Sequence, residues 1–219
     1  MAPLFSPRIN TIARASLILL PLLLILVVGG LVLYGNSSAV TNVGVAVPQP
    51  VAYPHNLHVA VLGLDCRYCH DSVDKSSFAD LPSTEACMSC HSQIAVTNPA
   101  IAPVRDSWQT GKPIEWIRVN QLPDYVYFNH EIHVKKGVGC ETCHGRVDQM
   151  TTDVKANSFY MSFCLDCHRD PAKYLRPLDK VTTMGYKPAG DQLVIGAQLV
   201  KEYNILPSSQ LINCSICHR

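Results

Sequence analysis

The sequence predicts a mainly irregular domain with short α-helices, preceded by one N-terminal helix that is long enough to span a membrane. Three observations lead to this fold class. Residues 53–219 are rich in proline and glycine and contain few long periodic runs. Ten cysteines in 219 residues are a strong deviation from average composition. Residues 15–34 form an uncharged, apolar run of 20 residues.

The apolar run at 15–34 is expected to form a transmembrane helix, because it is long enough to cross a hydrocarbon core. Arg8 and Arg14 precede it, and the next lysine or arginine is Arg67. The positive-inside rule therefore predicts that residues 1–14 are cytoplasmic and that residues 53–219 lie on the periplasmic side of a bacterial inner membrane. A cleaved signal peptide is the alternative, but the run exceeds the usual length of a signal core.

All ten cysteines belong to one pattern, Cys-x-x-Cys-His, which occurs five times. We number the copies motif 1 (Cys66, Cys69, His70), motif 2 (Cys87, Cys90, His91), motif 3 (Cys140, Cys143, His144), motif 4 (Cys164, Cys167, His168) and motif 5 (Cys214, Cys217, His218). Two thiols at this spacing bond to the two vinyl groups of one haem, and the following histidine ligates its iron. Zinc ribbons and disulfides also use paired cysteines, but neither needs a histidine after every pair. The sequence therefore predicts five covalently bound haem c groups.

The segment before the first motif and the order of the motifs suggest a duplicated module. Residues 35–52 are small and polar and contain proline, as expected of a linker. Two repeat units follow, at about 53–105 and 125–175, and each has a His-x-x-His pair followed by two motifs. Motif 5, at 214–218, closes a multihaem cytochrome c domain that spans 53–219. We expect the five haems to form its buried apolar mass.

Four histidines lie outside the motifs, and they are the candidates for the second axial ligands: His55, His58, His130 and His133. On a helix, a pair at i and i+3 projects both imidazoles from nearly one face, so two neighbouring haems can each receive one. Five six-coordinate haems need ten ligands, and the chain has nine histidines. One ligand is therefore expected to be a methionine. Met161 is favoured over Met150 and Met184, and Met88 is poorly placed inside motif 2.

One longer helix is predicted in the domain, over Gln192 to Asn204, where Ile195, Leu199 and Tyr203 recur at near-helical spacing. Residues 171–188 are expected to be irregular. The net charge is only +1, and there is no basic stripe and no glycine-rich phosphate loop. Nucleic acid is therefore excluded as an expected partner.

Several longer stretches show a resemblance to one family. They are FADLPSTEACMSCH (78–91), the segment 111–150, MSFCLDCHRDPAKYLRP (161–177) and CSICHR (214–219). On these residues the chain resembles the pentahaem cytochrome c subunit of alternative complex III, a bacterial quinol-oxidising complex of respiratory or photosynthetic chains. The haem motifs are generic to multihaem cytochromes, whereas residues 116–150 are far more specific to this family.

The resemblance implies an electron-transfer subunit of an oxidoreductase complex rather than a catalyst acting alone. Its partners would be an iron–sulfur and molybdopterin-enzyme-like subunit, polytopic quinol-binding subunits, a mono-haem cytochrome and a soluble electron acceptor. The alternative is a stand-alone, membrane-anchored multihaem quinol dehydrogenase, in which the first haem typically follows the helix more closely than Cys66 does. A multihaem reductase would need an open axial position, and the spare histidines and one methionine would fill every site.

Overall fold

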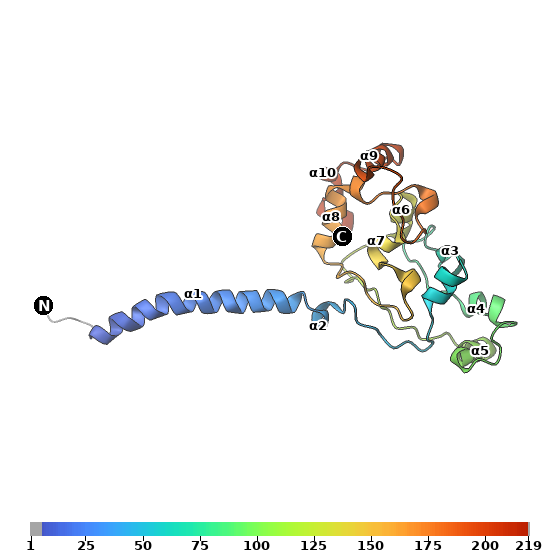
Figure 1. Cartoon of the computed structure of the whole chain (residues 1–219), viewed down its shortest axis with the longest axis horizontal. Coiled ribbons are helices and arrows are strands. Elements are labelled where there is room, and N and C mark those ends of the chain that lie inside the picture. The colour runs from blue at the N-terminus through green and yellow to red at the C-terminus, as the bar shows by residue number, and fades with distance from the viewer. Residues whose placement is uncertain (1–5, 219) are drawn as a thin grey trace. The chain divides into compact units, whose positions relative to one another are not determined.

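The computed structural model describes residues 6–218, and the chain divides into two compact units, Met1–Val43 and Gly44–Arg219. Both units are helical or irregular (Figure 1). Within residues 6–218 there is no β-strand, and β-type pairing is limited to two isolated antiparallel bridges, Ala46 with Val154 and Val138 with Leu175. The predicted fold class, mainly irregular with short helices and one long N-terminal helix, is confirmed.

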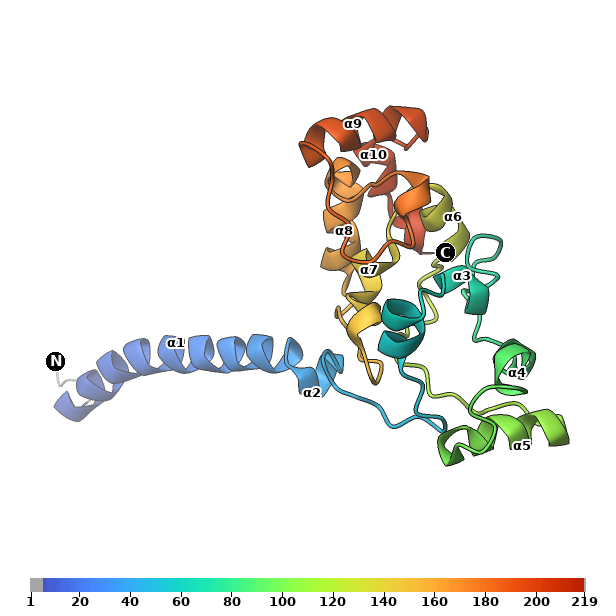
Figure 2. The same cartoon turned by 45° about the vertical axis from the view of Figure 1, so that its right-hand side comes forward.

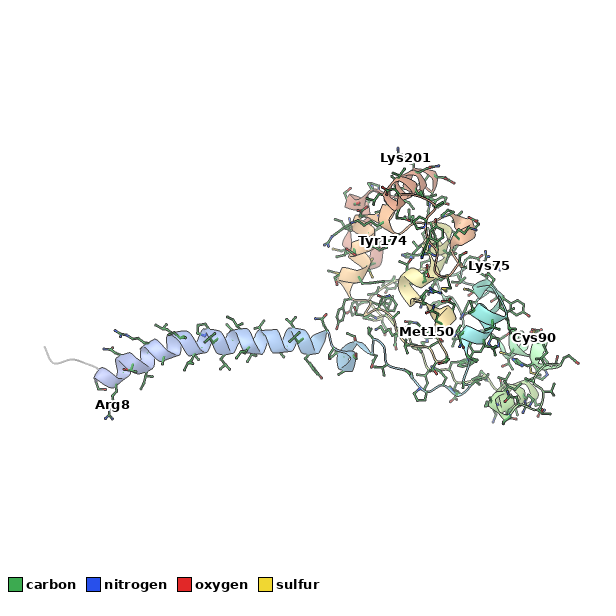
Figure 3. All side chains as sticks on the ribbon, in the orientation of Figure 1. Arg8, Lys75, Cys90, Met150, Tyr174 and Lys201 are labelled. Carbon is green, nitrogen blue, oxygen red and sulfur yellow. The ribbon has the colours of Figure 1, made fainter. Side chains whose placement is uncertain are left out.

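The first unit consists of the long helix α1 (Pro7–Gly35) and the short helix α2 (Ser38–Thr41). Proline is well suited to the first turn, since its missing N–H would have no partner there. The 29 residues of α1 extend for about 44 Å at 1.5 Å per residue, more than the roughly 30 Å of a hydrocarbon core. Its apolar side chains are exposed along its length (Figure 3). By length and composition α1 is compatible with a membrane anchor.

Helix α2 lies inside the segment that the sequence predicts as a linker, and the second half of that segment is also ordered. From Gly44 onward the chain packs within the second unit, where the Gly44 N–H donates to the carbonyl of Lys155 at 2.9 Å. Residues 44–52 of the predicted linker therefore belong to the second unit.

Short helices hold all five motifs in the second unit, as predicted: α3 (Cys66–Cys69), α4 (Thr84–His91), α7 (Cys140–His144), α8 (Met161–Arg169) and α11 (Cys214–Cys217). The remaining elements are η1 (Asn56–Val61), η2 (Pro99–Ile101), α5 (Ala102–Thr110), α6 (His130–Lys135), η3 (Val147–Gln149), η4 (Pro171–Lys173), η5 (Leu178–Lys180), α9 (Gln192–Glu202) and α10 (Ser208–Leu211). Figures 1 and 2 both show four of the motif helices in the spatial order α4, α3, α7, α8.

The predicted helix at 192–204 is confirmed as α9 (Gln192–Glu202), and residues 171–188 hold only the short segments η4 and η5. Helix α9 packs closely on η4, which directly follows motif 4. Gly196 makes this approach possible, because a Cβ atom there would overlap the backbone carbonyl of Ala172.

The second unit buries little apolar side-chain mass. Six hydrophobic residues of the described chain are buried: Val51, Val73, Val104, Leu175, Val181 and Leu199. A peptide domain of this length ordinarily encloses a larger core. This small core fits the expectation that bound porphyrins complete the interior.

Candidate haem-binding sites

The motif helices bring the two thiols of each pair together. Three of these helices start at a side-chain cap: Asp65 accepts from the Arg67 N–H at 2.9 Å, Ser83 from Ala86 at 3.3 Å and Asn213 from Ser215 at 3.1 Å. Once the helix has begun, cysteines at i and i+3 lie on one face. The histidine follows directly, so each motif presents two thiols and one imidazole from a single short segment.

The histidine rings are oriented by backbone carbonyls. A carbonyl oxygen can only accept, so each imidazole that contacts one through Nδ1 carries its hydrogen there and keeps the lone pair on Nε2. A histidine that ligates a metal usually donates its other ring N–H in this way. Seven histidines make such a contact at 2.7–3.1 Å: His58, His70, His91, His130, His133, His168 and His218.

The two repeat units build the same local structure around their His-x-x-His pairs. In the first repeat unit, Tyr53 stacks on His58 with ring centroids 4.4 Å apart and meets His55 edge-on at 4.7 Å. In the second repeat unit, Phe128 stacks on His133 at 4.5 Å and meets His130 edge-on at 4.7 Å. One difference from the expected helix is that the first pair lies at the start of η1, which is a π-helix. The two pairs nevertheless share the same stacked and edge-on ring contacts.

Three of the four spare histidines face a motif histidine at a distance that suits one iron. The ring centroids are 6.3 Å apart for His58 and His91. A nitrogen lies about 2 Å from the metal it ligates and about 1.2 Å from its own ring centre, so two axial imidazoles have centroids about 6.4 Å apart. The other two pairs are also close to this value, at 6.4 Å for His130 with His144 and 6.2 Å for His133 with His168.

Burial favours the neutral form of three of these imidazoles, His130, His133 and His144. Loss of solvent lowers the pKa of His130 and of His133, and it lowers the pKa of His144 to about 4. The neutral ring therefore predominates at pH 7, and its Nε2 lone pair is available to a metal.

Direct contacts join motif 2 to motif 1 and motif 1 to motif 3. The Tyr68 hydroxyl of motif 1 lies 2.8 Å from the Ser89 hydroxyl of motif 2. The segment at Val181 and Thr182 connects motifs 1 and 3. The Cys140 N–H donates to the Val181 carbonyl at 3.1 Å, and the Thr182 hydroxyl donates at 2.8 Å to Asp65, which caps motif 1.

Further contacts continue from motif 3 to motif 4. The side-chain amide of Asn157 donates to the Cys143 carbonyl at 2.7 Å. The rings of His144, Phe159 and Phe163 follow one another with centroid separations of 6.4 and 5.5 Å, and Phe163 directly precedes Cys164.

Motif 4 is joined to motif 5 through the segment around α10. His168 contacts the Leu211 carbonyl at 2.9 Å, and the Ser208 hydroxyl donates to the Arg169 carbonyl at 2.7 Å. Leu211 is three residues before motif 5. The motifs therefore lie in the spatial order 2–1–3–4–5, which differs from their order in the chain.

Each repeat unit contacts the loop that follows the first motif of the other repeat unit. In the second repeat unit, the Glu131 N–H donates to the Ser76 carbonyl in the loop after motif 1, at 3.1 Å. In the first repeat unit, the Asn56 N–H donates to the Met150 carbonyl in the loop after motif 3, at 2.9 Å. Ser76 and Met150 each lie six residues after their motif histidine. Motifs 1 and 3 are therefore each followed by a loop that contacts the other repeat unit.

Asp153 is a site residue that sequence reasoning missed. Nδ1 of His55 lies 2.8 Å from its carboxylate Oδ1, and neither buried atom has another hydrogen-bond partner among residues 6–218. The sequence holds no signal for this contact, because Asp153 lies 98 positions from His55. Phe128 was also missed, although it stands two residues before its His-x-x-His pair, as Tyr53 does before the first pair.

The candidate methionines lie in different places. Met150 follows η3 and lies beside Gly145, directly after motif 3. Met184 lines a cavity with Val59, Leu64 and Thr182 near motif 1. Met161 is the first residue of α8 and is 66% exposed.

The residues present fit covalently bound haem. All ten cysteines are free, so each motif has both thiols available for thioether bonds. No group of three or more His, Cys, Asp or Glu side chains in the described chain is arranged to hold a bare metal ion. When bound, haem supplies a reversible one-electron change at iron, which the axial ligands and their hydrogen bonds tune.

Comparison with known proteins agrees with this geometry. Residues 126–219, which include motifs 3 to 5, match the family model of cytochrome c7 and related cytochromes c. The chain is 37% identical over 97 residues to the multihaem cytochrome c subunit of a menaquinone reductase from Nitratidesulfovibrio vulgaris, over 44% of this chain and 45% of that protein. It is 27% identical over 88 residues to the cytochrome subunit of an acrylate reductase from Shewanella woodyi, over 40% of this chain and 57% of that protein.

These findings make the multihaem c-type cytochromes the class of protein that the chain resembles, most clearly over residues 126–219. Within that class the chain resembles cytochrome subunits that are named for a menaquinone reductase and an acrylate reductase. The chain spans about half the length of the curated relatives it matches.

Proposed function

We propose that this protein is a membrane-anchored pentahaem cytochrome that passes electrons along five haem c groups. The observation that supports this most strongly is the unbroken series of contacts between motifs in the order 2–1–3–4–5. Closely spaced redox centres with filled axial positions suit electron transfer, whereas catalysis at haem needs an open position.

The chain's residues would hold and tune the haems. The ten motif cysteines would form the thioether bonds, and His70, His91, His144, His168 and His218 would be the proximal ligands. His55, His58, His130 and His133 would supply four second ligands, and Met161 or Met150 the fifth. The backbone carbonyls at Nδ1 would fix the orientation of seven of these rings, and the Asp153 carboxylate that of His55.

The anchor in this proposal is α1. Arg8 and Arg14 at its N-terminal end support a cytoplasmic N-terminus and a periplasmic haem domain. Covalent haem attachment takes place on that side of the membrane in bacteria, so the motifs and the charge pattern support the same orientation.

The complex that this protein serves is proposed to be alternative complex III, in which electrons from quinol pass toward a periplasmic acceptor. The resemblance at residues 116–150 supports this assignment, and both curated relatives are named as subunits of larger enzymes. The expected partners are an iron–sulfur and molybdopterin-like subunit, polytopic quinol-binding subunits and a mono-haem cytochrome. The chain would be the electron-transfer subunit of that complex.

A second candidate is the reverse direction of electron flow. One relative is named as a subunit of menaquinone reductase, which favours delivery of electrons to a quinone. The same series of haems serves either direction, because one-electron transfer between them is reversible.

The test is to solubilise the host membranes in mild detergent, separate them on a native gel and stain for covalent haem. We expect this chain in a large assembly with iron–sulfur and polytopic partners, and membranes of a deletion strain are the control. Quinol oxidation by that assembly supports the first direction, and quinone reduction supports the second. A chain that migrates alone and accepts electrons from quinol contradicts the complex and favours a stand-alone quinol dehydrogenase.

A further inference from the structure

A buried ion pair joins motif 3 to a residue that lies far from it in the chain. Nη1 of Arg176 lies 3.0 Å from Oε1 of Glu141, and the two side chains are 8% and 14% exposed. Glu141 stands inside motif 3, directly after Cys140. The guanidinium lies against the backbone just before the motif, where a Cβ atom on Gly139 would overlap it. Glycine at that position therefore leaves the room that the ion pair needs.

Both members of the pair also hold residues 181–186, which we call the strap. Arg176 donates from Nη1 to the Thr183 carbonyl at 3.1 Å, and its guanidinium lies 4.9 Å from the centre of the Tyr186 ring. The Glu141 carboxylate accepts from two backbone N–H groups of the strap, at 2.5 and 3.2 Å. The strap is therefore fastened to motif 3 by both charged side chains.

The strap also contacts motif 1, so it spans the junction between motifs 1 and 3. Its Val181 carbonyl accepts from the Cys140 N–H of motif 3 at 3.1 Å. Its Thr182 hydroxyl donates at 2.8 Å to Asp65, which caps the helix of motif 1. Motifs 1 and 3 are central neighbours in the spatial order 2–1–3–4–5, and they belong to different repeat units. Electrons that travel along this series from one repeat unit to the other would pass this junction.

The ion pair is better suited to fixing geometry than to adding stability. Removing two charges from water costs free energy that their attraction often only balances, so apolar residues of similar volume are frequently as stabilising. Nε of Arg176 is also buried without a hydrogen-bond partner among residues 6–218. What the pair does provide is direction, because a planar guanidinium and a carboxylate bond to each other in few relative orientations.

We propose that Arg176 and Glu141 are positioning residues that fix, through the strap, how the haems of motifs 1 and 3 lie relative to each other. This inference rests on the proposed function and deepens it, since it names the contacts that set the central junction of the electron path. Arg146 is a further cation 4.0 Å from Glu141, but it is exposed and pairs more closely with Asp148, at 2.6 Å. Removing both positioning residues therefore frees the strap without leaving either charge of the buried pair behind.

The test uses the full-length, detergent-solubilised protein with its haems attached. Haems that lie close together give a two-signed circular dichroism band in the Soret region, and the shape of this band reports their relative orientation. We expect Arg176→Met to lower one reduction potential, because the carboxylate remains, and Glu141→Ala to raise one, because the cation remains. The double variant should change the Soret band, whereas its potentials should shift less than in either single variant.

Two neighbouring threonines test the strap in variants that keep the buried ion pair. Thr182→Val removes the hydroxyl that donates to Asp65, so it should change the Soret band and leave the reduction potentials unchanged. Thr183→Val is the matched control and should keep the wild-type band, because only the backbone carbonyl of Thr183 contacts Arg176. These two variants also keep the test valid if the charged variants fail to fold.

An unchanged Soret band in Thr182→Val, or in a folded double variant, would overturn the inference. Potentials that shift as far in the double variant as in a single variant would also overturn it, because the pair would then not be balanced in charge. Covalent haem counting by mass spectrometry tests the proposed function separately, since five attached haems with an unchanged band contradict only the role of the strap.

Discussion

At the scale of single residues, eight of the nine histidines have Nδ1 in contact with a defined oxygen atom. Most of these partners are backbone carbonyls, such as Pro54 for His58 and Asn129 for His133. His55 is different, because a carboxylate lies beside its ring. A carboxylate draws the Nδ1 proton toward itself and makes Nε2 a stronger donor to iron, which favours the ferric state.

Replacing this carboxylate should therefore raise one reduction potential. We expect Asp153→Asn to raise it by a value on the order of 60 mV, which is about a tenfold change in a one-electron equilibrium. Potentiometric titration followed by visible spectroscopy measures the shift. Asp179→Asn is the matched control, because that carboxylate is 69% exposed and pairs with Lys180. An Asp153→Asn protein with five unchanged potentials would show that the contact does not tune a haem.

The candidate site residues could be listed from the sequence, whereas the groups that contact their histidine rings could not. Cys-x-x-Cys-His specifies both thiols and the proximal ligand within five consecutive positions. The carbonyl partners come from distant loops, as with Tyr125 for His218 and Leu211 for His168. Any residue has a carbonyl, so no side-chain pattern marks these positions.

At the scale of elements, the short helices follow from local signals. Asp65, Ser83 and Asn213 are good cap residues that stand just before their motif helices. Helix α9 was predicted because its apolar residues recur at helical spacing. The π-helical η1 was not predicted, because its sequence NLHVAV is also compatible with an ordinary helix.

The packing of α9 on η4 gives a stability prediction. Gly196→Ala should destabilise the protein by about 1–3 kcal/mol, the usual range for overpacking, because the new methyl group would overlap the Ala172 carbonyl. Urea unfolding in detergent, followed by circular dichroism, measures the change. Gly190→Ala is the control, because its nearest neighbour is Ile195 at 4.0 Å. Equal stability of the two variants would show that α9 does not depend on this close approach.

At the scale of the whole molecule, the spatial order of motifs differs from the chain order because each repeat unit contacts the loop after the first motif of the other. The duplication itself was visible in the sequence, since two units share the same series of His-x-x-His and motifs. The contacts between the two repeat units were not visible in the sequence, because their partners are more than 50 positions apart. The contact of Glu131 with Ser76 is an example. Motif 2 and motif 5 consequently form the two ends of the series.

The domain as a whole has a small core of apolar side chains. Six buried hydrophobic side chains among the described residues are few for a domain of this size, so the haems are expected to complete the interior. The ten cysteines predicted that haems, rather than apolar side chains, make up much of the interior.

The most direct test of the central claim is the intact mass of the full chain, produced in a host that matures c-type cytochromes, together with peptide mapping. The account predicts the mass of the polypeptide plus five haems, with one haem on each of motifs 1 to 5. A purified protein that carries fewer than five, or that holds zinc or disulfides at any motif, would contradict it.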